Sequence, residues 1–256
     1  MQRRIDDSLI DDLQTSIGNG PAGRRPDAEQ NGIPDIVIRR LPIYARSLSY
    51  LYSEGVETVS SGELGNRLGV SAAQIRRDLS YFGEFGKQGK GYNVAYLLAE
   101  VKSILKLDRT WPVALIGLGH LGRAVLHYEG LVEQGFHIEA LFDHNPEKVH
   151  QRLSGLEIHS MQELPEVLAG ADIKMAIMAV PARSAQEAAD ALVEAGIRAI
   201  LNYAPITVQV PAYVRIRHID PIVALQSMTY YLDIEEQLST QSNGHSNEKV
   251  RSGKLD

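Results

Sequence analysis

An apolar run meets three closely spaced glycines in the stretch Val113-Ala114-Leu115-Ile116-Gly117-Leu118-Gly119-His120-Leu121-Gly122-Arg123-Ala124. The order of strand, glycine turn and helix start is the one that a dinucleotide-binding site requires. Gly117 can make the turn, Gly119 lets the backbone approach a pyrophosphate, and Gly122 lets the helix pack closely on the strand. The first N–H groups of the helix would then face the phosphates. The cofactor contacts predicted from this stretch are Gly117, Leu118, Gly119, His120, Leu121 and Gly122.

An acidic residue follows at the end of the next predicted strand, which spans residues 136–142. Asp143 lies 21 residues after Gly122, close to the spacing expected in a dinucleotide-binding unit. Its carboxylate would accept hydrogen bonds from the adenosine ribose hydroxyls and would repel a 2′-phosphate. The sequence therefore favours NAD(H) over NADP, with a solvated strand end as the alternative interpretation of Asp143.

The composition excludes several classes of protein. The 256 residues include no cysteine, and 44% of them are hydrophobic, so the chain can form packed cores without disulfides, thiolate metal sites or a thiol switch. No apolar run reaches the length needed to cross a membrane, and the N-terminus lacks the apolar segment of a secretory signal. We therefore expect a cytoplasmic protein with no membrane partner.

Charge is unevenly spread along the chain. Residues 33–110 contain 11 Lys and Arg against 8 Asp and Glu, whereas residues 111–256 contain 11 against 18. This asymmetry indicates two units with different partners, although a solvated basic face would give the same count. The predicted boundaries are a flexible arm at 1–32, a first domain at 33–110, a second domain at 111–219, a helix at 220–238 and a disordered tail at 239–256.

Helical periodicity and capping residues organise the first domain. Apolar residues at helical spacing predict a helix over residues 34–53. Capping boxes at Ser60 and Ser71 predict two short helices separated by Gly69, the second of which ends near Phe82. Two short helices joined by a glycine turn after a longer helix are typical of a helix-turn-helix, with a small helical bundle as the alternative.

The third helix and the residues after it favour double-stranded DNA as the partner. A helix fits the major groove, where arginine can read guanine and glutamine can read adenine. The stretch Gly83–Tyr92 has four glycines and two lysines, which suits the wing of a winged helix that reaches phosphates or the minor groove. The predicted DNA contacts here are Ser71, Gln74, Arg76, Arg77, Ser80, Lys87 and Lys90. For the two arginines, a solvated helix face or a pairing of Arg77 with Asp78 is the alternative.

Strands and helices alternate through residues 111–219, which predicts an α/β domain with a doubly wound parallel sheet of the Rossmann type. We expect one long helix over residues 120–134 and a short helix that begins at Pro146. Ligand contacts belong at the carboxyl ends of parallel strands. The further predicted cofactor contacts are therefore Val180, Pro181, Asn202, Tyr203, Ala204 and Pro205.

A last helix is predicted after the sheet is complete. Asp220 and Pro221 provide an N-cap and a first-turn proline, and the helix runs to about Leu238. Apolar residues surround much of its circumference, so the helix needs burial on more than one side. We predict that it packs on a second subunit in a homodimer.

The sequence resembles the Rex family of redox-sensing transcriptional repressors from about Ile33 to Leu238. The most specific similarity lies in the segments Arg40–Tyr44, Gln74–Gly83, Gly89–Tyr92, Gly117–Gly122 and Ile200–Pro205. The resemblance implies a homodimer in which a winged helix precedes a Rossmann domain and the last helix is swapped between subunits. It also implies binding to an inverted-repeat operator when NAD⁺ prevails or the site is empty, and release when NADH binds.

The resemblance further implies three coupling residues, Arg46, Tyr128 and Asp220. In the family the tyrosine and the aspartate come together across the dimer in the NADH state, and the arginine meets the aspartate in the DNA-binding state. From the residues alone, Arg46 is a phosphate contact, Tyr128 is a core tyrosine with a solvated hydroxyl, and Asp220 is an N-cap.

Two other functions use similar sequence features. A dehydrogenase would use the same glycine turn, but it needs a substrate pocket and an acid–base group. The roughly 110 residues between Trp111 and Asp220 are all used by the nucleotide fold, and the histidines form no metal or triad pattern, so we expect no enzyme and no metal site. A DNA-binding regulator gated by CoA is the other alternative, and Asp143 argues mildly against it.

Overall fold

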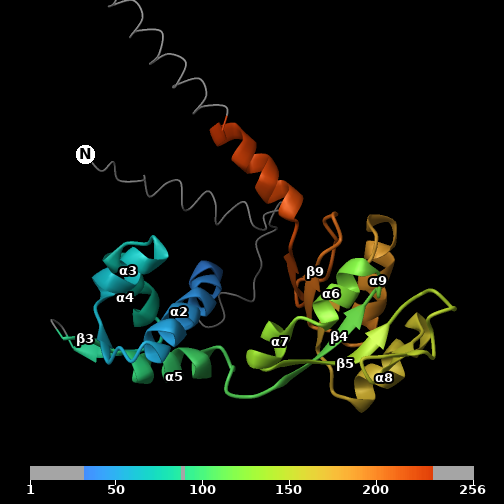
Figure 1. Ribbon diagram of the computed structural model, residues 1–256, viewed down its shortest axis with the longest axis horizontal. Helices are drawn as coiled ribbons and strands as arrows, with labels where there is room; N and C mark the ends of the chain where they lie inside the picture. The colour runs from blue at the N-terminus through green and yellow to red at the C-terminus, as the bar shows by residue number, and fades with distance from the viewer. Residues whose placement is uncertain (1–31, 88–89, 233–256) are drawn as a thin grey trace, which may run out of the picture.

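A computed structural model describes residues 32–87 and 90–232 of the chain. Two bodies lie along its longest axis, the first ending with helix α5 (Val94–Ile104) and the second beginning with strand β4 (Trp111–Ile116) (Figure 1). The predicted tail and nearly all of the predicted arm lie outside the described residues. Among the residues that are described, no helix is both long and apolar enough to span a membrane.

The first body is a helix-turn-helix with a small antiparallel sheet. Its other elements are α2 (Asp35–Ser53), β1 (Thr58–Val59), α3 (Ser61–Leu68), α4 (Ala72–Ser80), β2 (Gly86–Lys87) and β3 (Gly91–Asn93). Gly69 joins α3 to α4 with φ 69°, a conformation that favours glycine. Strand β3 pairs with β2 on one side and with β1 on the other, both antiparallel. The winged helix predicted from the capping residues and the glycine-rich stretch is confirmed.

Side chains cap both short helices, but only one cap is a full capping box. Ser60 Oγ accepts a hydrogen bond from Glu63 N at 3.1 Å, and the Glu63 carboxylate accepts one from Ser60 N at 2.8 Å. Ser71 Oγ accepts from Gln74 N at 3.2 Å, yet the Gln74 side chain donates to Asp78 Oδ1 at 2.7 Å. The reciprocal bond predicted at Ser71 is therefore wrong, because a buried carboxylate takes the Gln74 amide instead.

That buried carboxylate joins α2 to α4. Asp78 is fully buried, and Arg40 donates to it from Nε to Oδ2 at 2.6 Å and from Nη2 to Oδ1 at 2.8 Å. The Tyr44 hydroxyl donates to Oδ2 at 2.6 Å. The hydrogen bond to Asp78 raises the pKa of Arg40, while burial and the bond to Asp78 raise the pKa of Tyr44. The pairing of Arg77 with Asp78 is wrong, since Arg77 is exposed and Asp78 is used in the core.

The second body is a sheet in the order β10-β9-β8-β4-β5-β7-β6. Its further elements are α6 (His120–Leu126), α7 (Glu129–Glu133), β5 (Phe136–Phe142), β6 (Arg152–Leu153), β7 (Leu156–His159), η2 (Met161–Glu163), α8 (Leu164–Gly170), β8 (Met175–Met178), α9 (Ala182–Glu194), β9 (Ala199–Asn202) and β10 (Arg215–His218). Neighbouring strands are parallel except β6 and β7. The chain runs from central β4 to one edge, crosses back to β8 and continues to the other edge. The predicted Rossmann-type sheet is confirmed.

Both faces of this sheet are covered. On β4, Ala114 and Ile116 belong to the core cluster that contains residues of α8 and α9. Val113 and Leu115 point the other way, into a cluster against which residues of α6 and α7 pack. A sheet buried on both faces needs apolar residues at every position, which explains why the central strands are nearly continuous apolar runs in the sequence.

The long helix predicted over residues 120–134 is wrong as a single element. It is divided into α6 and α7 because Tyr128, between them, has an extended backbone with φ −80° and ψ 99°. The Tyr128 ring lies over Gly130, where an added Cβ would come within 2.7 Å of the ring. The break therefore carries the tyrosine side chain outward between two short helices.

The short helix predicted from Pro146 is also wrong, since residues 146–150 form turns. Asn145 Oδ1 accepts a hydrogen bond from Glu147 N at 2.9 Å, a local side-chain bond that competes with helix formation. The chain then reverses through β6 and β7, an antiparallel pair that extends the sheet by a strand absent from the prediction.

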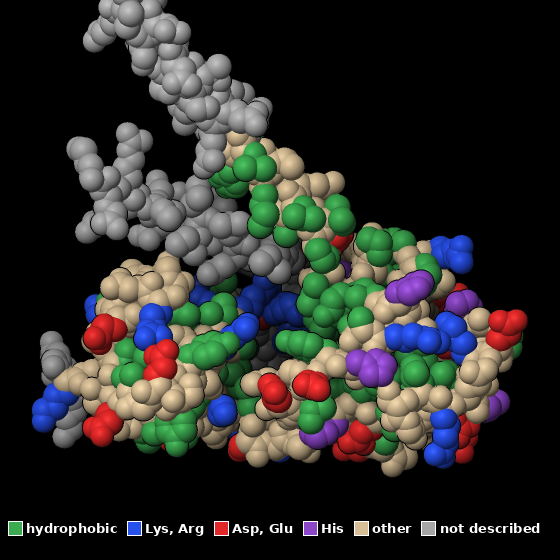
Figure 2. Space-filling model, in the orientation of Figure 1, with side chains coloured by type: hydrophobic (Ala, Val, Ile, Leu, Met, Phe, Trp, Pro, Cys, Tyr) green, Lys and Arg blue, Asp and Glu red, His purple; other side chains and the backbone are tan. Residues whose placement is uncertain are grey.

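Residues 221–232 form the described part of the last helix, which begins after Asp220 as predicted. Asp220 Oδ1 accepts from Ile222 N at 2.9 Å. The helix extends away from the sheet, and hydrophobic side chains line it (Figures 1 and 2). The apolar side chains at least 39% exposed are Ile222, Val223, Leu225, Met228, Tyr230, Tyr231 and Leu232. A helix with this surface needs a partner beyond the described part of its own chain.

Replacing the Asp78 carboxylate by an amide tests the contact between α2 and α4. In the Asp78→Asn protein Arg40 would remain charged in the core without a counter-charge, so we expect a loss of about 3–5 kcal/mol of unfolding free energy. Chemical denaturation measures this loss. Asp190→Asn is the control, because Asp190 is exposed on α9, and it should cost less than about 0.5 kcal/mol. Equal losses in the two proteins would contradict this account.

Candidate functional site

The glycine turn lies at the centre of the sheet, where the winding of the chain reverses. Strand β4 pairs with β5 on one side and with β8 on the other, so its carboxyl end borders the crevice of the switch point. Gly117 has φ 89°, and an added Cβ would lie 2.7 Å from the carbonyl oxygen of Ala179 after β8. Glycine is therefore required at this position both for its conformation and for its closeness to β8.

The other two glycines have different surroundings. An added Cβ on Gly122 would overlap the carbonyl oxygen of Gly117, so α6 packs directly against the turn. An added Cβ on Gly119 would meet no atom of the described chain within 4 Å. Residues 119–121 are exposed, whereas Leu118 is buried and its backbone N–H and carbonyl oxygen are both bonded within the protein. The turn is closed at its first and third glycines and open at the second.

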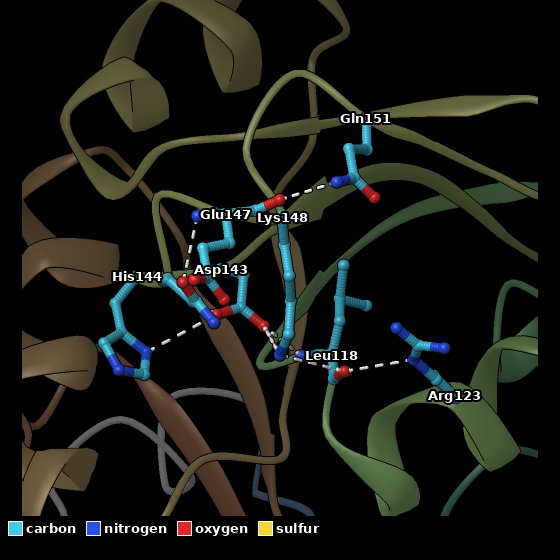
Figure 3. A network of polar contacts seen from close by, with 8 residues as sticks. Leu118, Arg123, Asp143, His144, Glu147, Lys148 and Gln151 are labelled. Carbon is cyan, nitrogen blue, oxygen red and sulfur yellow. Dashed lines mark hydrogen bonds and ion pairs between the residues drawn. The ribbon is translucent and has the colours of Figure 1, made fainter.

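Asp143 lies at the carboxyl end of β5, and its carboxylate faces the glycine turn (Figure 3). Oδ2 accepts from Leu118 N at 2.9 Å and from Lys148 Nζ at 2.8 Å, and Oδ1 accepts from Asn145 N at 2.9 Å. Lys148 Nζ also lies 3.3 Å from the Leu118 carbonyl oxygen. With only 2% of its surface exposed, Asp143 is not a solvated strand end.

The environment keeps Asp143 charged. Burial opposes its ionisation, but the hydrogen bonds from Lys148, Asn145 and Leu118 outweigh burial and lower the pKa of Asp143. Each carboxylate oxygen has about two lone-pair positions, and Oδ2 already receives two donors. Oδ1 receives one, with the ring of exposed His144 3.5 Å away. Oδ1 is therefore the oxygen of Asp143 with the fewer donors in the described structure.

The ends of β8 and β9 complete the crevice. Val180 and Pro181 follow β8, and Cγ1 of Val180 would lie 2.9 Å from a Cβ added to the first glycine of the turn. After β9, Tyr203 is half-buried, Ala204 is buried and Pro205 is exposed. The topology thus brings residues from the ends of β4, β5, β8 and β9 to one edge of the sheet.

Asn202 is fully buried and organises the loop after β9. Its Oδ1 accepts from Ala204 N at 2.9 Å, and its Nδ2 lies 3.1 Å from the Ile206 carbonyl oxygen. Nδ2 also lies 3.0 Å from His218 Nδ1 on β10. The Asn202 amide is used within the protein, so it shapes the crevice by holding residues 203–205 against the neighbouring strand.

The predicted DNA contacts lie on and beside α4. Arg76 and Arg77 are exposed, and Arg76 Nη1 donates to Ser61 Oγ of α3 at 2.9 Å. Within the described part of the chain, the Arg77 guanidinium has no hydrogen-bond or ion-pair partner. Ser71 caps the helix, and Ser80 Oγ donates to the Arg77 carbonyl oxygen at 2.8 Å. Arg77 is therefore the side chain of α4 that is most available to a ligand.

The other predicted DNA contacts are Gln74 on α4 and the two wing lysines, Lys87 and Lys90. Gln74 donates its side-chain amide to Asp78 one turn along the same helix, so this amide is already used within the protein. Lys90 is exposed in the turn just before β3. Lys87 belongs to β2, but its side chain lies outside the described part of the structure.

The three predicted coupling residues lie on separate elements. Arg46 is exposed on α2 and lines a groove of about 350 Å³ together with Ile43 and Arg67. Tyr128 is 65% exposed between α6 and α7, and Asp220 is half-buried at the start of the last helix. No hydrogen bond or ion pair joins any two of these three residues within residues 32–87 and 90–232.

Sequence reasoning missed several side chains at these sites. Lys148 stands in a turn with no motif around it, so nothing marked it as the partner of the strand-end aspartate. Arg40 and Asp78 are 38 residues apart, and Arg217 reaches Asp35 at 3.3 Å across 182 residues. These contacts depend on how the elements pack, and no spacing in the sequence records them.

The fold and the site define a DNA-binding regulator with a nucleotide-binding domain. A family model described as a putative DNA-binding protein N-terminus matches residues 32–80, and one described as a CoA binding domain matches residues 108–206. The redox-sensing transcriptional repressor Rex of Roseiflexus sp. (strain RS-1) is 59% identical over 199 residues, which cover 78% of this chain and 90% of that protein. Rex of Chloroflexus aurantiacus is 58% identical over 204 residues, which cover 80% and 96%.

Solved structures agree with these relatives. The crystal structure of RSP in complex with β-NAD⁺ and operator DNA matches with a TM-score of 0.75 and 37% identity, over 82% of this chain and 97% of that one. RSP in complex with β-NADH matches with a TM-score of 0.73 and 36% identity, over 82% and 99%. The chain belongs to the Rex family of redox-sensing transcriptional repressors. It is a transcriptional regulator, and the dehydrogenase alternative is wrong.

Removing the partner of Asp143 should change how this residue titrates. The lowered pKa of folded Asp143 means that its stabilisation is fully present above the ordinary aspartate pKa and is lost as pH falls through the lowered value. Lys148→Met should raise the pKa of Asp143 and lower stability at pH 7, with a smaller deficit below about pH 4. Carboxyl NMR titration and thermal unfolding at both pH values measure these effects.

Lys174→Met is the control for this prediction, because Lys174 pairs with Asp172, whose side chain is 90% exposed. That substitution should leave the pKa of Asp143 and the unfolding temperature close to those of the unmodified chain. An unchanged Asp143 titration in Lys148→Met would show that the ion pair does not set its ionisation.

Proposed function

We propose that the chain is a homodimeric repressor that binds an inverted-repeat operator in double-stranded DNA and releases it when NADH enters the crevice at Gly117–Gly122. The observation that carries this proposal is that a single chain of the Rex family contains both a winged helix and a glycine turn that is open at Gly119. Operator DNA, NAD⁺ and NADH are the ligands named for the related repressor RSP. Such a regulator works in the cytoplasm, where these ligands are present.

The crevice fits a dinucleotide in its shape and its charge. Gly119 leaves space for a diphosphate next to the first N–H groups of α6, which have no partner within the helix. Charged Asp143 can accept a ribose hydroxyl at Oδ1. The residues proposed to hold NAD(H) are Gly117, Leu118, Gly119, His120, Leu121, Gly122, Asp143, Val180, Pro181, Asn202, Tyr203, Ala204 and Pro205, with Leu118 and Asn202 acting by holding their loops in place.

The charge of Asp143 also bears on the choice between NAD(H) and CoA. The CoA-binding description of the second domain concerns the same sheet. CoA and NADP each carry a phosphate on the adenosine ribose, and a buried carboxylate beside that ribose would repel it. NAD(H) has only hydroxyls there, so the site favours it as the effector. The dinucleotide supplies a redox-dependent signal, and no reaction at the site is required.

For the DNA surface, we propose that Arg77 reads a base edge or a phosphate without first giving up a protein contact. Arg76 would have to leave Ser61 to do the same. Ser71 and the N-terminal N–H groups of α4 suit a phosphate. The remaining proposed contacts are Arg46, Gln74, Ser80, Lys87 and Lys90.

The apolar last helix supports the proposed homodimer. Its exposed apolar side chains need cover, and a swapped helix from a second copy would bury the same residues in both subunits. The proposed units are residues 33–110 for DNA, 111–219 for NAD(H) and 220–238 for dimerisation. In the assembled dimer, we propose that Arg46, Tyr128 and Asp220 couple the units, with Tyr128 and Asp220 meeting across the interface in the NADH state.

NADH can shift the repressor only by its difference in affinity for the two arrangements of the dimer. Saturating NADH should therefore weaken binding to an inverted-repeat operator about 5- to 150-fold, the usual range for coupled sites. Fluorescence anisotropy of a labelled operator measures this change, and sedimentation should give two chains per operator. Unchanged operator affinity at saturating NADH would contradict the proposed release of the operator by NADH.

NADPH is the matched control for the effector, because it differs from NADH only by a ribose phosphate that Asp143 should repel, and CoA is the rival effector that also carries a ribose phosphate. We expect both to need much higher concentrations than NADH for the same release. Release by CoA at lower concentrations than NADH would reassign the effector.

Removing the free guanidinium of α4 tests the DNA surface. Arg77→Ala should weaken operator binding by about 1–3 kcal/mol with relaxed specificity if the side chain reads a base. If it contacts a phosphate, all sequences should be weakened alike and the salt dependence should flatten. Arg152→Ala is the control, because Arg152 is exposed on β6 of the other body. Unaltered operator affinity in Arg77→Ala would show that Arg77 does not contact the DNA.

A further inference from the structure

An ion pair crosses from the edge of the sheet to the first helix of the DNA-binding domain. Arg217 Nη2 lies 3.3 Å from Asp35 Oδ1 and 3.4 Å from Oδ2. Arg217 belongs to β10, the edge strand of the sheet, and Asp35 stands in the first turn of α2. The pair therefore joins the last strand of the nucleotide domain to the first helix of the chain.

Asp35 is held from both sides. Arg39, one turn along α2, donates from Nε to Asp35 Oδ2 at 2.7 Å. Partial burial opposes the ionisation of Asp35, but the bond from Arg39 and the charge of Arg217 outweigh it and lower the pKa of Asp35. The carboxylate is charged and already oriented when Arg217 meets it, which reduces the entropy lost in forming the contact between the domains.

On the sheet side, β10 is tied to the nucleotide crevice. His218 follows Arg217 and lies opposite Asn202 in the register of β9 and β10. The Asn202 amide contacts His218 Nδ1 at 3.0 Å and also holds residues 203–205 at the carboxyl end of β9. A displacement of this loop by a ligand would therefore act on the strand that carries Arg217.

On the helix side, α2 is tied to α4. Asp35 and Arg40 stand on the same continuous helix, and Arg40 makes the buried double hydrogen bond to Asp78 of α4. A buried pair resists separation because either charge alone would be left in the core. A rotation of α2 about its contact with β10 would thus carry α4 with it.

We propose that Arg217 and Asp35 are positioning residues that transmit the state of the nucleotide crevice to α4. Both lie on one chain. Asp35 shares α2 with Arg46, whereas Arg217 lies on β10, which contains none of the residues Arg46, Tyr128 and Asp220. The contacts run without a break from the loop after β9 through Asn202 and β10 to α2, and from there to the buried carboxylate of Asp78. This inference rests on the proposed function, because the transmitted signal is the effect of NADH on operator binding.

The measured quantity is the NADH response, the ratio of operator dissociation constants with and without saturating NADH. An exposed ion pair accounts for only part of a coupling between sites, so Arg217→Met should reduce this ratio roughly two- to fivefold. Asp35→Asn should reduce it similarly, and the double variant should be no worse than either single variant. Arg217→Lys, which keeps the charge, should restore most of the response.

Two controls separate signalling from folding. Arg39→Met removes the other partner of Asp35 but leaves the contact between the domains, and it should keep more of the response than Arg217→Met. Asp172→Asn removes one member of an exposed pair with Lys174 on the nucleotide domain and should leave the response unchanged. All variants should unfold within about 4 °C of the unmodified chain, as expected for exposed pairs.

An unchanged NADH response in Arg217→Met would overturn the inference, as would single effects that simply multiply in the double variant. A lowered unfolding temperature with an unchanged response would assign the pair to stability alone and would also overturn it. If the unmodified chain itself showed no response to NADH, the proposed function would fail. A normal response in that chain, together with unchanged variants, would reject this inference and leave the proposed function in place.

Discussion

The buried carboxylate of Asp78 is the contact on which the arrangement of the DNA-binding domain depends. A charge in a protein core is tolerated only when it is paired and hydrogen-bonded, and this one receives bonds from Arg40, Tyr44 and Gln74. The bonds from Arg40 and Tyr44 hold α4 against α2. With Asp78 in the core, Arg76, Arg77 and Ser80 lie on the exposed face of α4.

A second constraint acts in the nucleotide domain, where the parallel sheet is buried on both faces. Burial forces the central strands to be apolar, so polar side chains can gather only where the strands end. Asp143 takes this position after β5, and it accepts hydrogen bonds from Leu118, Lys148 and Asn145. It therefore holds the glycine turn in place. The Asn202 amide likewise holds the loop after β9 in place, through hydrogen bonds to Ala204 and Ile206.

The DNA-binding domain and the nucleotide domain meet through a contact that is weaker than those inside each domain. The ion pair between Asp35 and Arg217 is partly exposed, in contrast to the buried pair of Arg40 and Asp78. The contact between the domains is thus less protected from solvent than the contact inside the DNA-binding domain. The helix after Asp220 leaves its apolar side chains exposed on the described chain, which is the surface that the proposed homodimer would cover.

The sequence by itself determined the elements and their order. The apolar runs predicted the strands, the serine caps predicted α3 and α4, and the spacing from Gly117 to Asp143 predicted the dinucleotide unit, because these patterns reflect local geometry and burial. It failed at Gln74, whose amide bonds Asp78 one turn along α4 and does not complete the capping box, and at Tyr128, whose extended backbone divides a helix. Only the tertiary structure decided that Lys148 faces Asp143, that Arg40 pairs with Asp78 and that Arg217 reaches Asp35. Pairing between charges depends on distance in space, and the sequence records only distance along the chain.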